Sequence, residues 1–167
     1  VNRIDDFAYT PEQNIAHSMT ALMAQNKGAG KKNRMQEGFR CGMVLESIYG
    51  IFIFLVCFIF AKPLMCLFVQ DEEVIMHGVT YLHLISIMYI LPAFTNGIQG
   101  FFRGIGDLKI TLISSLVNMT VRVIVAAPLV FSLHLGIEAL PYSYLAGWIG
   151  MLMAELPLLI RTYKAYE

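Results

Sequence analysis

The sequence predicts an all-α, polytopic membrane protein, and its composition and the distribution of its charges both indicate this fold class. The 167 residues are 57% hydrophobic and only 14% charged, whereas soluble domains are about 45–50% apolar and about 25% charged. The formal net charge is zero, which gives no electrostatic case for nucleic acid as a partner. The three cysteines form no CxxC pair, so we expect neither a disulfide nor a zinc site: Cys41, Cys57 and Cys66.

Four stretches of the chain are long and apolar enough to cross a bilayer, which takes about 20 residues of helix. They cover residues 43–69, 79–102, 110–133 and 140–160. We expect a break near Lys62-Pro63 in the first of them. Each of the other three contains an internal proline, which membrane helices tolerate because neighbouring groups satisfy the freed backbone carbonyl.

A more polar helix precedes them and covers residues 2–26. Its polar side chains repeat at intervals of four and three residues, so they share one helical face. We expect a spanning helix, kinked at Pro11 and surrounded by protein. A helix lying on the membrane surface is the alternative. The shared face carries Asp6, Thr10, Gln13, His17 and Thr20.

Lysine and arginine in the short loops indicate the orientation of five spanning helices. These residues follow the first, third and fifth helices, whereas the opposite loops, 70–73 and 132–136, contain none. Because short cytoplasmic loops are enriched in Lys and Arg, we expect the C-terminus to be cytoplasmic and the N-terminus to be outside. The residues concerned are Lys27, Lys31, Lys32, Arg34 and Arg40, then Arg103 and Lys109, then Arg161 and Lys164.

Arg122 is the strongest functional candidate among the polar residues. It lies about twelve residues into the 110–133 helix, near the bilayer centre at about 1.5 Å of rise per residue. An intramembrane arginine costs about 2.5 kcal/mol or more and normally faces the bundle interior or a watery cavity. A structural arginine bonded to helix-end carbonyls is the alternative.

Other polar and aromatic residues at helical spacing are candidates for lining the same cavity: Gln13, His17, Asn96, Gln99, Asn118, Tyr144 and Trp148. Asp6 and Glu155 are candidates for ion coupling. For Glu155, either snorkelling to the cytoplasmic surface or pairing with Arg122 is an alternative role. No metal-ligand spacing and no Ser/His/Asp or Cys/His arrangement is recognisable, so we expect no enzyme, no metal site and no cofactor.

Three segments of the chain resemble conserved motifs of one transporter family. Residues 24–34 resemble its loop "GQNxGAGxxxR", and residues 102–107 resemble its loop "LRGxGD". Between them, residues 63–82 resemble its pattern "PLMxLFxxDxEVIxxGxxYL". The order and spacing of the three matches make the resemblance specific to the multidrug and toxic compound extrusion (MATE) family.

The resemblance implies a fold of twelve helices in two six-helix lobes related by a pseudo-twofold axis. Residues 1–167 would form part of the C-terminal lobe, from its second to its sixth helix. The first helix of that lobe and the whole N-terminal lobe would be missing from these residues. The N-terminal lobe would be the partner of this chain.

The implied function is secondary active multidrug efflux, by an antiporter with alternating access in the inner or plasma membrane of the cell. Its substrates would be small organic, often cationic, compounds, including antibiotics. The driving gradient would be H⁺ or Na⁺. Sodium-coupled members carry an acidic residue eleven positions before the motif arginine, where this chain has Pro92, so the coupling ion stays open.

Two other functions remain as alternatives. A related flippase for lipid-linked saccharides would need a strongly cationic cavity to hold a pyrophosphate, and Arg122 is the one candidate for it. A non-transporting membrane scaffold or accessory subunit would lose only stability on replacement of Arg122.

Overall fold

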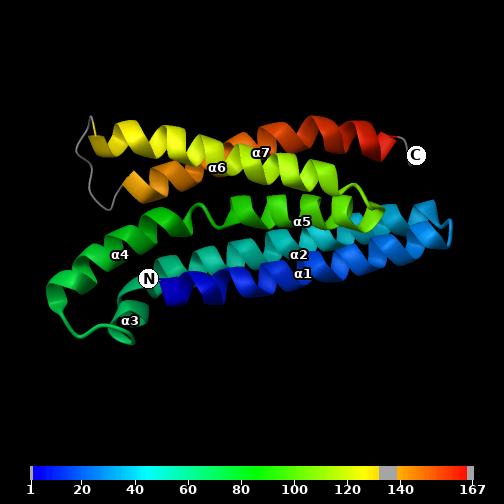
Figure 1. Ribbon diagram of the computed structural model, residues 1–167. Coiled ribbons are helices and arrows are strands. Elements are labelled where there is room, and N and C mark those ends of the chain that lie inside the picture. The colour runs from blue at the N-terminus through cyan, green and yellow to red at the C-terminus, as the bar shows by residue number, and fades with distance from the viewer. Residues whose placement is uncertain (1, 132–138, 165–167) are drawn as a thin grey trace.

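The computed structural model describes residues 2–131 and 139–164, which form helices joined by short turns, with no strand. The helices in this described part of the chain are α1 (Asn2–Gly28), α2 (Lys32–Ile59), α3 (Ala61–Cys66), α4 (Glu72–Ser86), α5 (Ile90–Ile105), α6 (Leu108–Phe131) and α7 (Ala139–Lys164). The long helices run side by side along one direction, and α3 and α4 lie at one end of the molecule (Figure 1).

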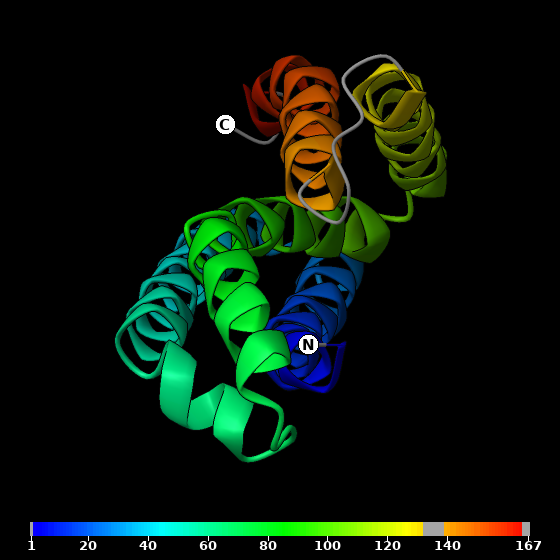
Figure 2. The same ribbon diagram turned by 90° about the vertical axis from the view of Figure 1, so that its left-hand side faces the viewer.

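Helix α5 occupies the centre of the fold. It packs against α1 and α2 on one side and against α6 and α7 on the other, as the end-on view shows (Figure 2). Most of its residues are buried, and its left-handed end at Gly106, with φ of 84°, turns the chain into α6. The two groups of helices therefore meet through α5.

Two glycines bring α5 into backbone contact with α1. A Cβ atom added to Gly100 would lie 2.7 Å from the carbonyl oxygen of Ala16, and one added to Gly104 would lie 2.3 Å from the Cβ of Met23. The hydroxyl of Thr20 donates a hydrogen bond of 3.2 Å to the carbonyl of Gly100. Small residues one turn apart allow this kind of close helix packing in membranes.

Among the described residues, three helices are long and apolar enough to span a membrane, namely α2, α6 and α7. The pair α4 and α5, bent by 47°, counts as a fourth if it forms one broken span. Helix α1 is not in this set because it is more polar. It nevertheless packs against both α2 and α5, and it buries Ala8, Ala16, Met19 and Met23. Its spanning of the membrane stays a prediction.

Two expected helices have different boundaries in the structure, and in both a proline lies next to the break. The 43–69 helix begins earlier, at Lys32, and ends at Ile59. The 79–102 helix is divided into α4 and α5 at residues 87–89. A proline cannot donate to the carbonyl four residues before it. Pro63 and Pro92 therefore remove the bonds to Ile59 and Met88.

The turn between α1 and α2 is shorter than the basic segment from Lys27 to Arg40 that we expected to follow the first helix. It contains only residues 29–31, and Gly30 adopts a φ of 67°, which a residue with a Cβ rarely takes. Arg34 and Arg40 accordingly lie on α2 and not in a loop. In the first of the two loops expected on the opposite side, the Asp71 carboxylate caps α4 by accepting a hydrogen bond from the backbone N–H of Glu73. The second of these loops, residues 132–136, lies outside the described residues.

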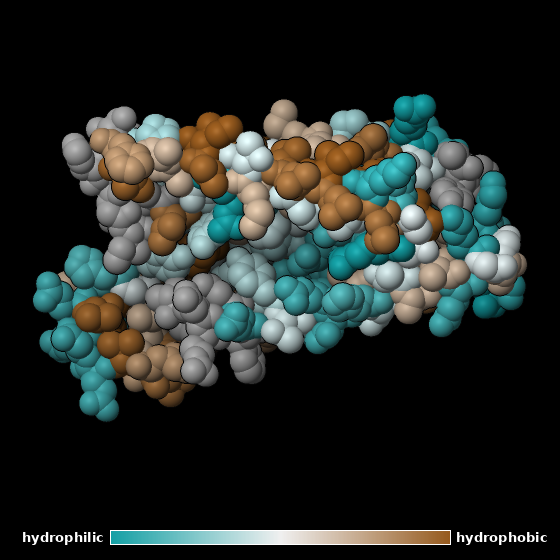
Figure 3. Space-filling view, in the orientation of Figure 1, coloured by the Kyte–Doolittle hydropathy of each residue, from teal (hydrophilic) through white to brown (hydrophobic). Residues whose placement is uncertain are grey.

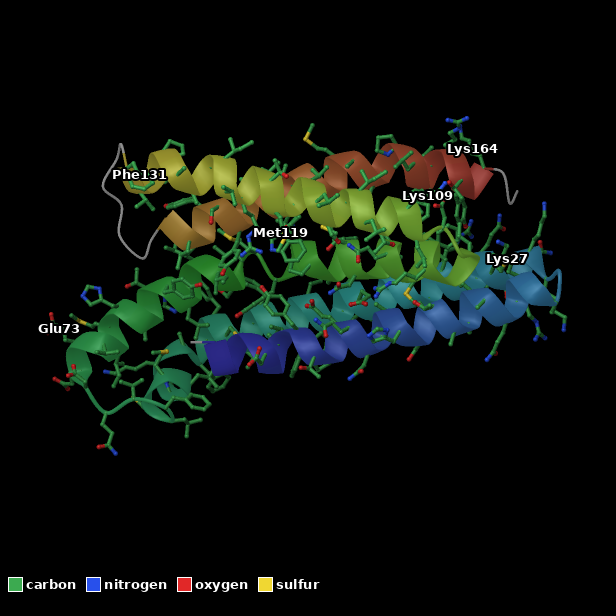
Figure 4. The ribbon with its side chains drawn as sticks, viewed as in Figure 1. Lys27, Glu73, Lys109, Met119, Phe131 and Lys164 are labelled. Atoms are coloured by element: carbon green, nitrogen blue, oxygen red, sulfur yellow. The ribbon has the colours of Figure 1, made fainter. Side chains whose placement is uncertain are left out.

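Basic side chains are concentrated at one end of the helices but are not confined to it, because Lys62 of α3 lines a groove with Glu72 and Glu73 at the other end. Lys27, Lys109 and Lys164 gather at one end of the molecule, and Glu73 and Phe131 lie at the other (Figure 4). Apolar side chains cover α6 and α7 between these ends (Figure 3). Much of this surface consists of large exposed side chains that suit contact with lipid: Leu112, Leu116, Met119, Val123, Met153 and Ile160.

Candidate functional site: a polar cavity beside α5

A cavity of about 550 Å³ opens beside α5, where α1, α4, α6 and α7 come together. Six of the residues that line it are among the candidates selected from the sequence: Asp6, Gln13, Asn96, Arg122, Tyr144 and Trp148. The other two lining residues, Tyr9 and Ile85, were not selected. Tyr9 lies on α1 one turn before Gln13, so the helical spacing could have revealed it.

Arg122 is held on the wall of this cavity by an aromatic ring of α7. Its guanidinium carbon lies 3.8 Å from the ring centroid of Tyr144, a cation–π arrangement. Gly147, one turn further along α7, makes room for the arginine stem, because an added Cβ would lie 2.4 Å from the Cγ of Arg122. The arginine therefore contacts α7 through Tyr144 and Gly147.

Three of the selected residues lie in a second cluster, between α5, α6 and α7. Glu155 is fully buried there, and its Oε1 accepts a hydrogen bond of 3.4 Å from Gln99. Arg103 acts on the same carboxylate electrostatically. The snorkelling and Arg122-pairing alternatives for Glu155 are thus both wrong. Asn118 donates to the sulfur of Met151 at 3.5 Å in this interface.

His17 does not line the cavity. It lies on α1, one turn beyond Gln13, and its side chain is exposed. The polar face of α1 therefore divides, with Asp6 and Gln13 in the cavity wall and His17 outside it.

Two buried acidic residues were missed by reasoning from the sequence. Glu12 and Glu46 are both fully buried, on α1 and α2. Glu12 does not share the polar face of α1; it lies one turn from both Ala8 and Ala16, on the face that packs against α2 and α5. A signal was present, because a glutamate four residues from alanines on either side falls on the small-residue face of the helix.

The cavity combines three aromatic side chains with one charge of each sign. Tyr9 and Trp148 add aromatic surface that attracts cations and apolar groups, whereas one face of the Tyr144 ring already carries the Arg122 guanidinium. Asp6 adds a carboxylate opposite in sign to Arg122. Within residues 2–131 and 139–164, no group of three or more His, Cys, Asp or Glu residues could hold a metal ion. The arrangement suits binding of amphipathic organic molecules.

Comparisons with known proteins place the chain among membrane transporters. The model of a protein family described as MatE matches residues 1–129. The probable multidrug resistance protein NorM of Thermotoga maritima is 24% identical over 150 residues, which cover 89% of this chain and 31% of that protein.

Two solved structures have the same fold over most of this chain. One is a multidrug resistance MATE family transporter of the MOP superfamily in an inward-facing conformation, with a TM-score of 0.83 and 16% identity over 89% of this chain and 34% of that one. The other is the MATE transporter ClbM in complex with Rb⁺, with a TM-score of 0.81 and 17% identity over 98% of this chain and 40% of that one. The chain thus spans about a third of the length of the proteins it matches.

Proposed function

The chain belongs to the MatE family, whose members are membrane transporters and not enzymes, and from this premise we propose that it forms part of a multidrug efflux antiporter. In this proposal the described helices belong to the C-terminal lobe of a longer, two-lobed protein. The substrates are small organic cations with an apolar body. They leave the cell in exchange for H⁺ or Na⁺ as the lobes open alternately to each side of the membrane.

The observation that carries this proposal is the composition of the cavity beside α5. Aromatic rings and a carboxylate favour a flat organic cation, whereas a lone arginine gives too little positive charge to hold a pyrophosphate. Asp6 and Arg122 lie on opposite sides of α5, on α1 and α6. A molecule in the cavity would therefore touch both groups of helices.

The charge at the helix ends supports an orientation for this protein in the cell membrane. The end that carries Lys27, Lys109 and Lys164 would face the cytoplasm, and with it the C-terminus (Figure 4). Lys27 also donates a hydrogen bond to the carbonyl of Ile105 at the end of α5. This bond places a positive charge where the helix dipole of α5 is negative.

Flux through liposomes tests the proposal. We expect the two-lobed protein to move a fluorescent organic cation when an H⁺ or Na⁺ gradient is applied, and to move a neutral analogue of the same size at least tenfold more slowly, since about 1.4 kcal/mol of binding separates such rates. We expect residues 1–167 alone to give no flux, because the cavity would lack the wall that the other lobe provides.

Two results would contradict the proposal. Gradient-independent leakage of both compounds would identify a pore or a scaffold, and efficient flux by residues 1–167 alone would show that the second lobe is dispensable. An empty liposome and one that contains an unrelated membrane protein serve as controls.

A further inference from the structure

Two glutamates lie where only small or apolar side chains would be expected. On α1, Glu12 occupies the middle of a buried face formed by Ala8, Ala16 and Met19. On α2, Glu46 lies between Gly42 and Gly50 on the buried face. Both side chains have no exposed surface.

The turn at Gly30 brings the two glutamates to the same depth. Glu12 precedes Gly30 by 18 residues and Glu46 follows it by 16, so at about 1.5 Å per residue both lie about 25 Å from the turn on adjacent helices. Helices α1 and α2 pack against each other over this length.

Helix α5 closes the third side of this position. Gly100 contacts Ala16, so one turn earlier on each of these helices Asn96 neighbours Glu12. A Cβ added to Gly97 would lie 3.6 Å from the Cγ of Glu46. We call Glu12 and Glu46 the carboxyl pair.

None of the four carboxyl oxygens of the pair has a hydrogen-bond partner among the described residues. Glu46 acts electrostatically on Glu12, and Asn96 is a polar side chain beside Glu12. The charge of Glu12 also acts on Tyr49 of α2. Other titratable groups on the helices packed here have different neighbours: Cys57 on α2 acts on Tyr49, Tyr9 on α1 packs against the ring of Tyr89, His83 on α4 lies against the carbonyl of Phe58, and Arg103 on α5 acts on Glu155. Asp6 and His17 are exposed on α1, as are Glu37 and Arg40 on α2.

Two unpaired carboxylates in this position would be very unstable. The effective cost of burying one ion is several kcal/mol, and like charges at close range add to it. A single proton held between the two groups removes the repulsion between like charges and leaves one negative charge, shared by the two carboxyl groups, to be buried. No lysine or arginine of the described chain supplies a positive charge there.

We propose that Glu12 and Glu46 form a proton-binding site in which one proton is held between the two carboxyl groups. Asn96 links the site to the cavity, because it neighbours Glu12 and lines the cavity wall. Proton release there would leave two negative charges between α1, α2 and α5 and would weaken their packing. That this event is coupled to export rests on the proposed function; the proton site itself does not.

The pH dependence of thermal stability tests the site in the two-lobed protein, purified in detergent. A buried carboxyl group that holds a proton in the folded state stabilises at low pH, and its contribution is lost as the pH rises. We therefore expect the wild type to lose about 1 °C in melting temperature between mildly acidic and mildly alkaline pH. About 1 kcal/mol has this effect in a protein about three times the length of this chain, because the entropy of unfolding is about 2.1 cal/mol/K per residue.

The variants Glu12→Gln and Glu46→Gln decide whether one proton is shared. A glutamine amide donates permanently to the remaining carboxylate, so we expect each single variant to lose the whole pH effect and the double variant to lose no more. The control, Glu37→Gln, changes an exposed glutamate of α2 and should keep the wild-type behaviour. If each single variant removes only half of the pH effect on the melting temperature, the two groups bind protons independently and the proposal is wrong. A wild type whose melting temperature does not fall with rising pH would also overturn it.

Salt distinguishes a proton from a metal cation. If Na⁺ or K⁺, but not choline, protects the wild type at alkaline pH, the pair binds a metal cation and the proton assignment is wrong. Equal stability in the three salts supports the proton.

Flux measurements test the coupling separately. We expect both single variants to bind the organic cation with unchanged affinity but to lose at least 90% of flux driven by a pH gradient. Full flux in these variants would remove the coupling while leaving the proton site. An inactive wild type would refute the proposed function instead.

Discussion

Replacement of Gly104 with alanine will separate α1 from α5 and will cause the largest loss of stability that we expect from a single methyl group. The added Cβ would lie 2.3 Å from the Cβ of Met23 and 2.7 Å from the carbonyl oxygen of Thr20. The backbone oxygen cannot move without shifting α1. Overpacking of this kind costs about 1–3 kcal/mol. Thermal unfolding in detergent measures the effect.

Gly28→Ala is the matched control for this experiment. Gly28 is also a helical residue, at the end of α1, but no atom lies within 4 Å of an added Cβ. We expect it to keep or slightly raise the melting temperature, because alanine favours helix over glycine by about 1 kcal/mol. Equal melting temperatures for the Gly104 and Gly28 variants would show that α1 and α5 are not in backbone contact.

Replacement of Arg122 with alanine will reduce export at least tenfold while leaving the fold intact. The guanidinium lies over the Tyr144 ring on the cavity wall, so its loss removes a cation–π contact of about 0.5–2 kcal/mol and changes the charge of the cavity. The ratio of initial flux rates in liposomes measures the effect, and circular dichroism verifies the fold.

Arg161→Ala serves as the control, because this exposed arginine lies in the last turn of α7, outside the cavity. We expect it to export normally. Tyr144→Phe keeps the aromatic ring and should retain most of the flux. If Arg122→Ala loses only stability and exports at the wild-type rate per folded molecule, the residue is structural and the scaffold alternative gains support.

The sequence alone was sufficient to predict the long apolar helices, because a run of about 20 mostly apolar residues is typical of a membrane-spanning helix. It located their interruptions less well. Pro63 and Pro92 both lie a few residues after the break that they accompany, since the bond that a proline removes is the one to the carbonyl four residues earlier. The expected spans therefore ended or broke at the wrong positions.

For the cavity, the sequence was informative about faces but not about neighbours. The spacing of Asn96 and Gln99 placed both near one stripe of α5, yet Asn96 lines the cavity and Gln99 bonds Glu155 on α7. Which helix covers a given face depends on packing between distant segments, and one sequence carries no direct record of it. Glu12 was missed for the same reason, because its burial depends on α2 and α5.

Thiol labelling tests most directly whether the cavity beside α5 binds the exported compound. With Cys41, Cys57 and Cys66 first replaced by serine, single cysteines are introduced at Gln13, in the cavity wall, and at Glu37, exposed on α2 near the turn at Gly30. We expect the transported cation to slow labelling at position 13 and to leave labelling at position 37 unchanged. Equal rates at position 13 with and without the cation would contradict the account.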